Sequence, residues 1–326
     1  MQNKVITITD GTLTVRILTV GATIYEILFP DRSGRLTDLI VGYPEPDDYL
    51  HNGAFFGATV GRCANRIGGA RFSIDGETYH LTENDHGSCI HGGKQNFTVQ
   101  EFEIAAQSEN SVTLRVVSPD GTDGFPGTVT ATVMYTVQNS ALSIEYEAVS
   151  DRDTVINMTN HAYFNLAGEG SVLQTTLCSP ADRYCPGNQY CLPVGVEAVD
   201  GTPFDFRAEQ PISVFRTLPH PQTDGIPGFD HHFFVPGEGY RPFVTAKCDK
   251  TGIRMDVTST QEGFQLYTAP RLHGAGKHGT ELVPFGAFCI EAQCAPDAIN
   301  HPYGRMPLFR AGETYREKTT YAFRNF

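Results

Sequence analysis

One carboxylate is the strongest candidate for a catalytic group in this sequence. Glu291 follows Phe288, Cys289 and Ile290 in a run typical of a buried β-strand. Removing a carboxylate from water is costly unless the group is hydrogen-bonded or takes part in chemistry. The pattern therefore indicates that Glu291 serves a reaction or a binding site.

Two histidines could supply a second proton-transfer group. His161 lies among amide, hydroxyl and aromatic side chains in residues 157–165, and His91 precedes two glycines that leave its ring uncrowded. Imidazole changes charge near neutral pH and therefore suits proton transfer. A core histidine with satisfied hydrogen bonds would explain His161 equally well.

A metal site is an alternative for Asp230, which precedes two further histidines. No HxH, HExxH or Cys/His pair at ligand spacing occurs in the sequence, so we expect no metal.

Asn65 and Arg66 lie between glycines in residues 61–69 and offer donors suited to neighbouring hydroxyl groups, although a solvated loop arginine is the simpler interpretation. No GxSxG motif or Cys–His motif indicates a nucleophile. The glutamate and the histidines, with the amide and guanidinium donors and a second carboxylate, suit acid–base chemistry on a neutral, polyhydroxylated substrate such as a sugar.

The elements that must position these residues are strands from end to end. Alternating polar and apolar runs joined by Asp-Gly predict hairpins with type I′ turns at Asp10-Gly11 and Asp75-Gly76. No window of about 12 residues has the apolar stripe of a helix, and the best short helical candidate is 212–218. We therefore expect an all-β protein of packed antiparallel sheets, with residues 1–326 in a single domain. The strands expected most clearly are 5–9, 13–17, 71–74, 77–80, 128–137, 142–149, 254–258, 264–268 and 287–293.

Composition narrows the classes of function. The 326 residues carry 24 Lys and Arg against 37 Asp and Glu, a net charge of −13, so we expect no nucleic-acid partner. No apolar run approaches the ~20 residues of a membrane span, and the N-terminal residues lack the apolar core of a signal peptide. The eight cysteines include no CxxC pair, which favours free thiols. A cytoplasmic protein without a membrane partner is the expectation.

Eight segments that follow one another in order carry a family resemblance. Together they resemble the aldose 1-epimerase (galactose mutarotase) family, and the two ends of the chain, 5–38 and 312–326, are similar to its terminal strands. A single such segment would mean little, but eight in order are highly specific. The segments are 61–67, 91–93, 124–127, 157–168, 200–206, 228–233, 265–268 and 291–298.

The resemblance implies a fold, a reaction and a set of site residues. The fold would be a large antiparallel β-sandwich, the supersandwich, with an open cleft for the sugar. The reaction would interconvert α and β anomers of aldohexoses such as galactose and glucose. Glu291 would remove a proton from the anomeric hydroxyl, and His161 would deliver one to the ring oxygen. It implies no metal or organic cofactor, an aldohexose as small-molecule partner, and a monomer or homodimer. The positions that would contact the sugar are Asn65, Arg66, His91, Asp230 and Gln265.

Two positions depart from the family pattern. Phe102 stands where the family commonly has Trp, and Ala295 stands where it often has an aromatic residue. If these residues line the cleft, we expect a wider pocket and weaker sugar binding. Three other functions stay open: a noncatalytic carbohydrate-binding module, a hexose-phosphate epimerase, which needs additional cations, and a glycosidase, which needs two carboxylates.

Overall fold

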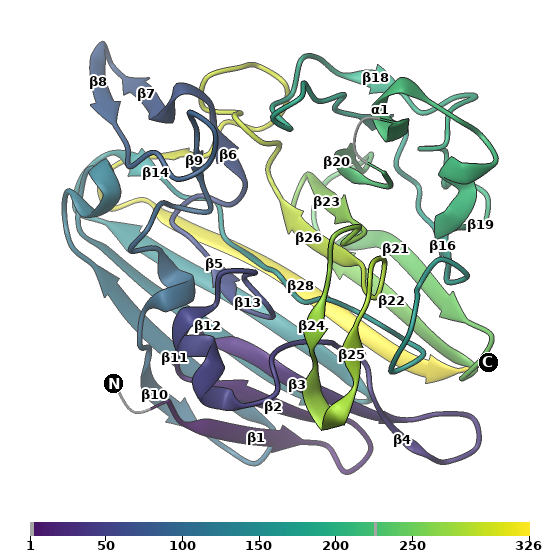
Figure 1. The fold of residues 1–326 in the computed structure, drawn as a ribbon. Coiled ribbons are helices and arrows are strands. Elements are labelled where there is room, and N and C mark those ends of the chain that lie inside the picture. Colours follow the sequence, from purple (N-terminus) through teal and green to yellow (C-terminus); the bar gives the residue numbers. More distant parts are fainter. Residues whose placement is uncertain (1–2, 225–226) are drawn as a thin grey trace.

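Strands make up nearly all of the regular structure, as the sequence pattern predicts. The computed structural model describes residues 3–224 and 227–326 (Figure 1). Met1 and Gln2, at the start of the N-terminal stretch considered above, lie outside the described residues. Within the described part, the α-helical content is α1 (Pro221–Asp224), a single turn. The all-β prediction is therefore confirmed.

The largest sheet has nine strands, and all its pairs are antiparallel. The last strand of the chain, β28, lies in the middle of this sheet, between β13 and β22 (Figure 1). In spatial order the strands are β10 (Glu103–Gln107), β11 (Ser111–Ser118), β12 (Val129–Gln138), β13 (Ala141–Ser150), β28 (Thr314–Asn325), β22 (Ile253–Ser259), β21 (Arg241–Cys248), β16 (Thr176–Cys178) and β19 (Gln210–Pro211).

Two smaller sheets complete the main layers. The four-stranded sheet is β1 (Val5–Thr9), β2 (Thr14–Leu18), β3 (Thr23–Pro30) and β4 (Leu36–Asp38). The five-stranded sheet is, in spatial order, β18 (Glu197–Ala198), β17 (Arg183–Tyr184), β20 (Asp230–Phe234), β23 (Gly263–Tyr267) and β26 (Cys289–Gln293).

Short pairs and single turns connect these layers. The two-stranded pairs are β5 (Thr59–Val60) with β15 (Thr159–Asn160), β6 (Arg66–Ile67) with β9 (Cys89–Ile90), β7 (Arg71–Ile74) with β8 (Glu77–His80), β14 (Thr154–Val155) with β27 (Leu308–Phe309), and β24 (Gly274–Ala275) with β25 (Glu281–Leu282). The 3₁₀ turns are η1 (Pro46–His51), η2 (Gly68–Ala70), η3 (Phe97–Val99), η4 (Thr122–Gly124), η5 (Ile212–Arg216) and η6 (Lys277–Gly279). The short helical candidate at 212–218 thus forms the 3₁₀ turn η5.

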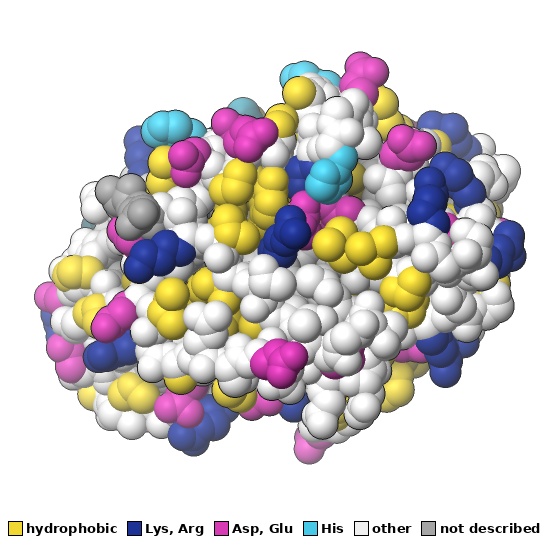
Figure 2. Space-filling view, turned by 90° about the horizontal axis from the view of Figure 1, so that it is seen from below, with side chains coloured by type: hydrophobic (Ala, Val, Ile, Leu, Met, Phe, Trp, Pro, Cys, Tyr) yellow, Lys and Arg dark blue, Asp and Glu magenta, His cyan; other side chains and the backbone are white. Residues whose placement is uncertain are grey.

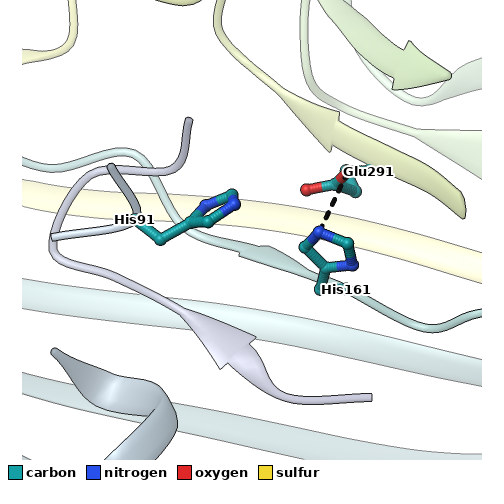
Figure 3. A group of neighbouring side chains, drawn as sticks. All are labelled: His91, His161 and Glu291. Atoms are coloured by element: carbon teal, nitrogen blue, oxygen red, sulfur yellow. Dashed lines mark ion pairs between the residues drawn. The ribbon is translucent and has the colours of Figure 1, made fainter. Parts of the chain in front are cut away.

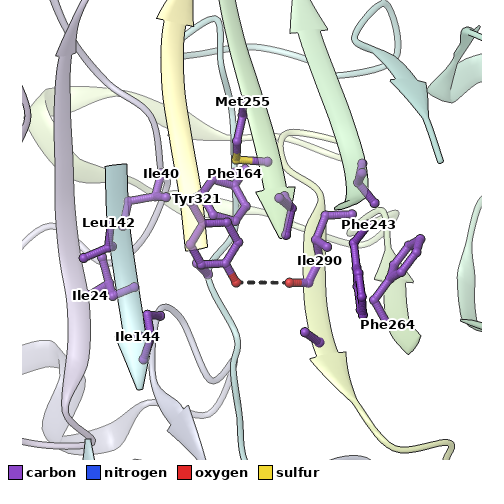
Figure 4. Packing of buried hydrophobic residues seen from close by; sticks show 14 of the residues in the cluster. Ile24, Ile40, Leu142, Ile144, Phe164, Phe243, Met255, Phe264, Ile290 and Tyr321 are labelled. Carbon is purple, nitrogen blue, oxygen red and sulfur yellow. Dashed lines mark hydrogen bonds between the residues drawn. The ribbon is translucent and has the colours of Figure 1, made fainter. Parts of the chain in front are cut away.

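The core follows from the period of two in the strands. Along β12 every second residue from Val129 to Val137 is buried, because successive side chains of a strand point to opposite faces. Figure 4 shows this core between the sheets, where Tyr321 of β28 donates a hydrogen bond to the carbonyl of Ile290 in β26 at 3.2 Å. Full burial of each large apolar side chain stabilises the fold by about 1.5–3 kcal/mol. The five-stranded sheet is thereby fixed on its core side.

The two predicted Asp-Gly turns differ in structure. Asp75 and Gly76 both have positive φ, 50° and 88°, and join directly paired strands, as a type I′ turn requires. The first hairpin closes instead through four residues, because Thr9 pairs with Thr14. There the Asp10 carboxylate accepts hydrogen bonds from the backbone of Thr12 and Leu13. The side chain of Asp10 therefore stabilises a longer loop than the predicted turn.

The outer surface carries mixed charge. Figure 2 shows Lys and Arg side chains interspersed with Asp and Glu over the face that it presents, with apolar side chains between them. In the described part of the chain, no helix is long and apolar enough to cross a membrane.

Candidate active site

A cleft of about 740 Å³ brings the predicted residues together. Segments far apart in the sequence form its walls, from Tyr43 near the N-terminus to Glu291 in β26. Six of the seven predicted site residues line it: Asn65, Arg66, His91, His161, Asp230 and Glu291. The seventh, Gln265, is buried behind Asp230 and donates a hydrogen bond from Nε2 to its Oδ1 at 2.7 Å.

Strand register explains why β20, β23 and β26 present polar groups to the cleft. Gln265 lies opposite Glu291, and Asp230 lies opposite Tyr267, two residues further along β23. Opposed residues and residues two apart share one face of a sheet, so these four side chains point the same way. Ile290 points to the other face and packs in the main core. Ala292, on the other side of Glu291, packs in the same core, so the two direct neighbours of Glu291 anchor the strand that carries it.

His161 lies directly beside Glu291. Its Nε2 atom is 3.6 Å from Glu291 Oε1 (Figure 3). Its Nδ1 atom is 3.5 Å from the sulfur of Cys289. The backbone of His161 is fixed on both sides, because its N–H donates to Ala58 and its carbonyl accepts from Gly57. The ring also stacks on Tyr163 at a centroid distance of 4.9 Å. These contacts hold the imidazole in one orientation.

His91 and Asn65 fix each other through two hydrogen bonds. The His91 backbone donates to the Asn65 carbonyl, and the Asn65 backbone N–H donates to His91 Nδ1 at 3.1 Å. Because Nδ1 is the acceptor, the proton of the neutral ring lies on Nε2, which becomes a donor. Gly92 follows with φ of 88°, and a Cβ atom there would lie 2.4 Å from the Gly61 carbonyl oxygen. This close approach requires a glycine.

Three groups in the cleft have the residue types of a metal site. His91, His161 and Glu291 can each offer a ligand atom within 4.8 Å of the others. A ligating imidazole nitrogen must present a lone pair, whereas the Asn65 contact places a proton on His91 Nε2. The donor set therefore fits a sugar hydroxyl better than a cation.

A second acidic and histidine cluster lies beside the hairpin β24–β25. Glu26, Asp38 and His278 form it, and the Lys277 ammonium donates to Asp38 Oδ2 at 2.6 Å. The lysine already supplies the positive charge that a metal ion would bring.

Burial controls the protonation of the catalytic candidates. It raises the pKa of Glu291 well above its usual value; the nearby charge of Asp230 adds to this, and Arg66 partly offsets it. Burial also lowers the pKa of His161 to about 4, against the opposing effects of its own carbonyl and of Asp230. The pKa of His91 falls for the same reason, with contributions from His161 and Arg66. Burial thus favours the uncharged forms of these side chains, whereas the proton transfers implied by the family resemblance need an ionised Glu291 and a protonated His161.

The sequence analysis did not identify three further residues, of which Tyr267 and Phe55 line the cleft and Asp85 contacts a residue that does. Asp85 accepts a hydrogen bond from Arg66 Nε at 2.7 Å and so fixes the guanidinium. Tyr267 lies two residues beyond Gln265 on the same strand, and strand periodicity alone could have placed it there. Phe55, whose ring centroid is 4.6 Å from that of His91, lies in a loop that carries no such signal.

The two departures from the family pattern lie outside the cleft. Phe102 is buried in the main core, against Phe97. Ala295 is buried in a small cluster with Cys185, Phe234 and Ala298. The hypothesis that both residues widen the pocket is therefore wrong, and aromatic rings from other segments line it. These rings are Tyr43, Phe55, Phe56, Tyr163 and Tyr267.

Known proteins are similar to this chain in sequence and in fold over nearly their whole length. The family model described as Aldose 1-epimerase matches residues 4–322. Galactose mutarotase of Rattus norvegicus is 38% identical over 95% of this chain and 91% of its own. Aldose 1-epimerase of Escherichia coli K12 is 34% identical over 95% of this chain and 92% of its own. The crystal structure of a GalM/aldose epimerase homologue from C. elegans is 28% identical, with a TM-score of 0.93 and 99% of both chains covered.

Proposed function

Because this chain belongs to the aldose 1-epimerase family and is an isomerase that interconverts α and β anomers of aldoses, we propose that Glu291 is its catalytic base and His161 its catalytic acid. The observation that carries the proposal is the buried pair itself, with 3.6 Å between Oε1 and Nε2 at the floor of the cleft. Both groups lie within reach of one sugar ring.

Ring opening needs two proton transfers. Glu291 takes the proton of the anomeric hydroxyl, the bond between C1 and the ring oxygen breaks, and His161 Nε2 gives its proton to that oxygen. Rotation about C1–C2 exposes the other face of the aldehyde, and the two transfers then run in reverse to close the ring. Each positioned proton transfer contributes typically ~10²–10⁴-fold to the rate.

The reactive pair must hold one proton, and that proton must lie on His161. Burial favours the neutral carboxyl of Glu291, whose Oε2 has no hydrogen-bond partner among the described residues. Sugar hydroxyls that donate to this oxygen stabilise the carboxylate and lower its pKa. Substrate binding thereby moves the proton to Nε2.

Neutral aldohexoses, including galactose and glucose, are the proposed substrates. His91 Nε2 and Arg66 donate to sugar hydroxyls, and Asp230, held by Gln265, accepts from them. Asn65 contributes through its contact with His91. Asp230 and Glu291 line the cleft together with Arg66 and Arg271, so the lining has no excess of Lys and Arg over Asp and Glu to attract an anionic substrate.

The test is polarimetry on freshly dissolved α-galactose, α-glucose and glucose 6-phosphate. We expect the wild-type chain to accelerate the change in rotation of the neutral sugars far more than that of the phosphate. A preference for the phosphate would favour the hexose-phosphate epimerase alternative. No acceleration with any sugar, at concentrations where binding is measurable, would favour a noncatalytic carbohydrate-binding module.

We also propose that residues 1–326 form one domain, that the protein works in the cytoplasm without a cofactor, and that it is a monomer or homodimer. One core cluster that extends from Ile6 to Phe323 supports a single domain. Eight free cysteines are typical of a reducing compartment. A single cooperative unfolding transition, and a mass by light scattering of one or two chains, would test the domain and the assembly.

A further inference from the structure

One strand holds the imidazole of His161 at both of its nitrogens. Cys289 and Glu291 are two residues apart on β26, so their side chains leave the same face of the sheet about 6.6 Å apart. The ring lies between them, with Nδ1 at 3.5 Å from the sulfur and Nε2 at 3.6 Å from the carboxyl oxygen. All three side chains are buried.

The sulfur is an uncharged partner for the ring. Burial, together with the charges of Glu291 and Asp230, raises the pKa of Cys289 well above its usual value, so the thiol keeps its proton. A thiol sulfur is a weak hydrogen-bond acceptor. If Nδ1–H donates to it, Nε2 is the nitrogen that gains and loses a proton in the cleft.

A charged partner would change the chemistry. A carboxylate beside Nδ1 stabilises the imidazolium and makes it a weaker acid. A catalytic acid must release its proton to the ring oxygen, so a neutral partner serves it better. The thiol can therefore orient the ring without stabilising its charged form.

We propose that Cys289 is the positioning residue of His161: its sulfur accepts the Nδ1–H, directs Nε2 into the cleft and adds no charge. This inference rests on the proposed role of His161 as the acid. The other polar or titratable groups around the ring are His91, Tyr163, Tyr267, Asp230 and the carbonyl of His161 itself.

The tautomer of His161 in the sugar-free enzyme gives the first test. Nitrogen-15 NMR of the imidazole, between pH 5 and 8, should show Nδ1 protonated and Nε2 bare. The opposite tautomer would overturn the proposal, because the sulfur would then have no proton to accept. This measurement needs neither substrate nor a variant.

Cys289→Ala and Cys289→Ser give the second test, with Cys248→Ala as the matched loss of a buried thiol away from the cleft. We expect Cys289→Ala to lower kcat about 10- to 100-fold with KM nearly unchanged, because a misdirected acid impairs only the proton transfer. Cys289→Ser, which keeps an uncharged acceptor, should recover most of the loss. Cys248→Ala should behave as wild type.

Two outcomes would distinguish a failure of the role proposed for Cys289 from a failure of the role proposed for His161. Wild-type kcat in Cys289→Ala, with His161→Asn inactive, would overturn the role of Cys289 alone. Wild-type kcat in His161→Asn would overturn the proposed acid itself. An equal loss in Cys289→Ala and Cys289→Ser would also contradict the acceptor role. If Cys289→Ala does not fold, the tautomer measurement decides.

Discussion

Lys277→Met should destabilise the fold and weaken sugar binding together. Lys277 is 3% exposed, and its ammonium donates to Asp38 and to the carbonyl of Tyr25. It lies in η6, between strands β24 and β25, so it fastens this hairpin to the four-stranded sheet (Figure 1). Gly274 and Ala275 of the same hairpin line the cleft.

The expected loss of stability follows from the Asp38 carboxylate, which stays buried when the lysine is removed. Removing one partner of a buried ion pair costs about 3–5 kcal/mol, because the other charge stays buried without compensation. His278, with Nε2 at 3.4 Å from Asp38, is the next cation and offsets part of the loss. We therefore expect Lys277→Met to lower the free energy of unfolding, measured with urea, by about 3 kcal/mol. Lys318→Met, which breaks an exposed pair with Glu145, should cost at most about 1 kcal/mol.

The pH dependence has a definite sign. Burial would raise the pKa of Asp38, but Lys277 and His278 outweigh burial and hold that pKa below its usual value. The ion pair therefore stabilises the fold fully above the unfolded pKa of about 3.9, and this stabilisation disappears as pH falls through the folded pKa. Lys277→Met should therefore reduce the free energy of unfolding most at pH 7, and progressively less as the pH falls below the unfolded pKa towards the folded pKa of Asp38. A loss no larger than that of Lys318→Met, or one independent of pH, would refute the reasoning.

Three further predictions concern the cleft and its surroundings. The pair Glu291–His161 should give a bell-shaped pH profile of kcat/KM. Its acid limb should fall near pH 4, because the buried imidazole gains a second proton for the pair there. An acid limb at the ordinary histidine pKa of about 6.5 would contradict the effect of burial on His161. Gly92→Ala should lower the Tm and raise KM, because the new Cβ meets the Gly61 carbonyl and displaces His91; calorimetry and polarimetry would test both, and unchanged values would show that the loop can relax. Ala295→Trp should destabilise the fold by about 1–3 kcal/mol through overpacking and leave the KM for galactose and glucose unchanged; a changed ratio of the two KM values would place Ala295 at the sugar after all.

Strand periodicity predicted much of this fold. The alternation from Val129 to Val137 and the Asp75-Gly76 turn were correct, because side-chain direction and backbone conformation are local properties. The predicted type I′ turn at Asp10-Gly11 was wrong, because an aspartate side chain that accepts hydrogen bonds from the backbone stabilises a longer loop equally well.

Long-range contacts in the site could not be predicted in the same way. His161 and Glu291 are 130 residues apart in sequence, and their 3.6 Å contact depends on how two sheets pack. The apolar run before Glu291 correctly indicated a buried carboxylate, but it could not show that Cys289 faces the imidazole. Residue type alone also misplaced Phe102 and Ala295, because an aromatic position in a family pattern can belong to the core as well as to a cleft.

Mutarotation by Glu291→Gln tests the central claim most directly. Gln keeps the shape of the side chain and removes its basicity, and Glu103→Gln changes an exposed carboxylate on β10 as a matched control. Polarimetry with α-galactose should show a fall in kcat of at least about 100-fold for Glu291→Gln and none for Glu103→Gln. If Glu291→Gln has the wild-type circular dichroism spectrum and a kcat within a few-fold of wild type, Glu291 is not the base.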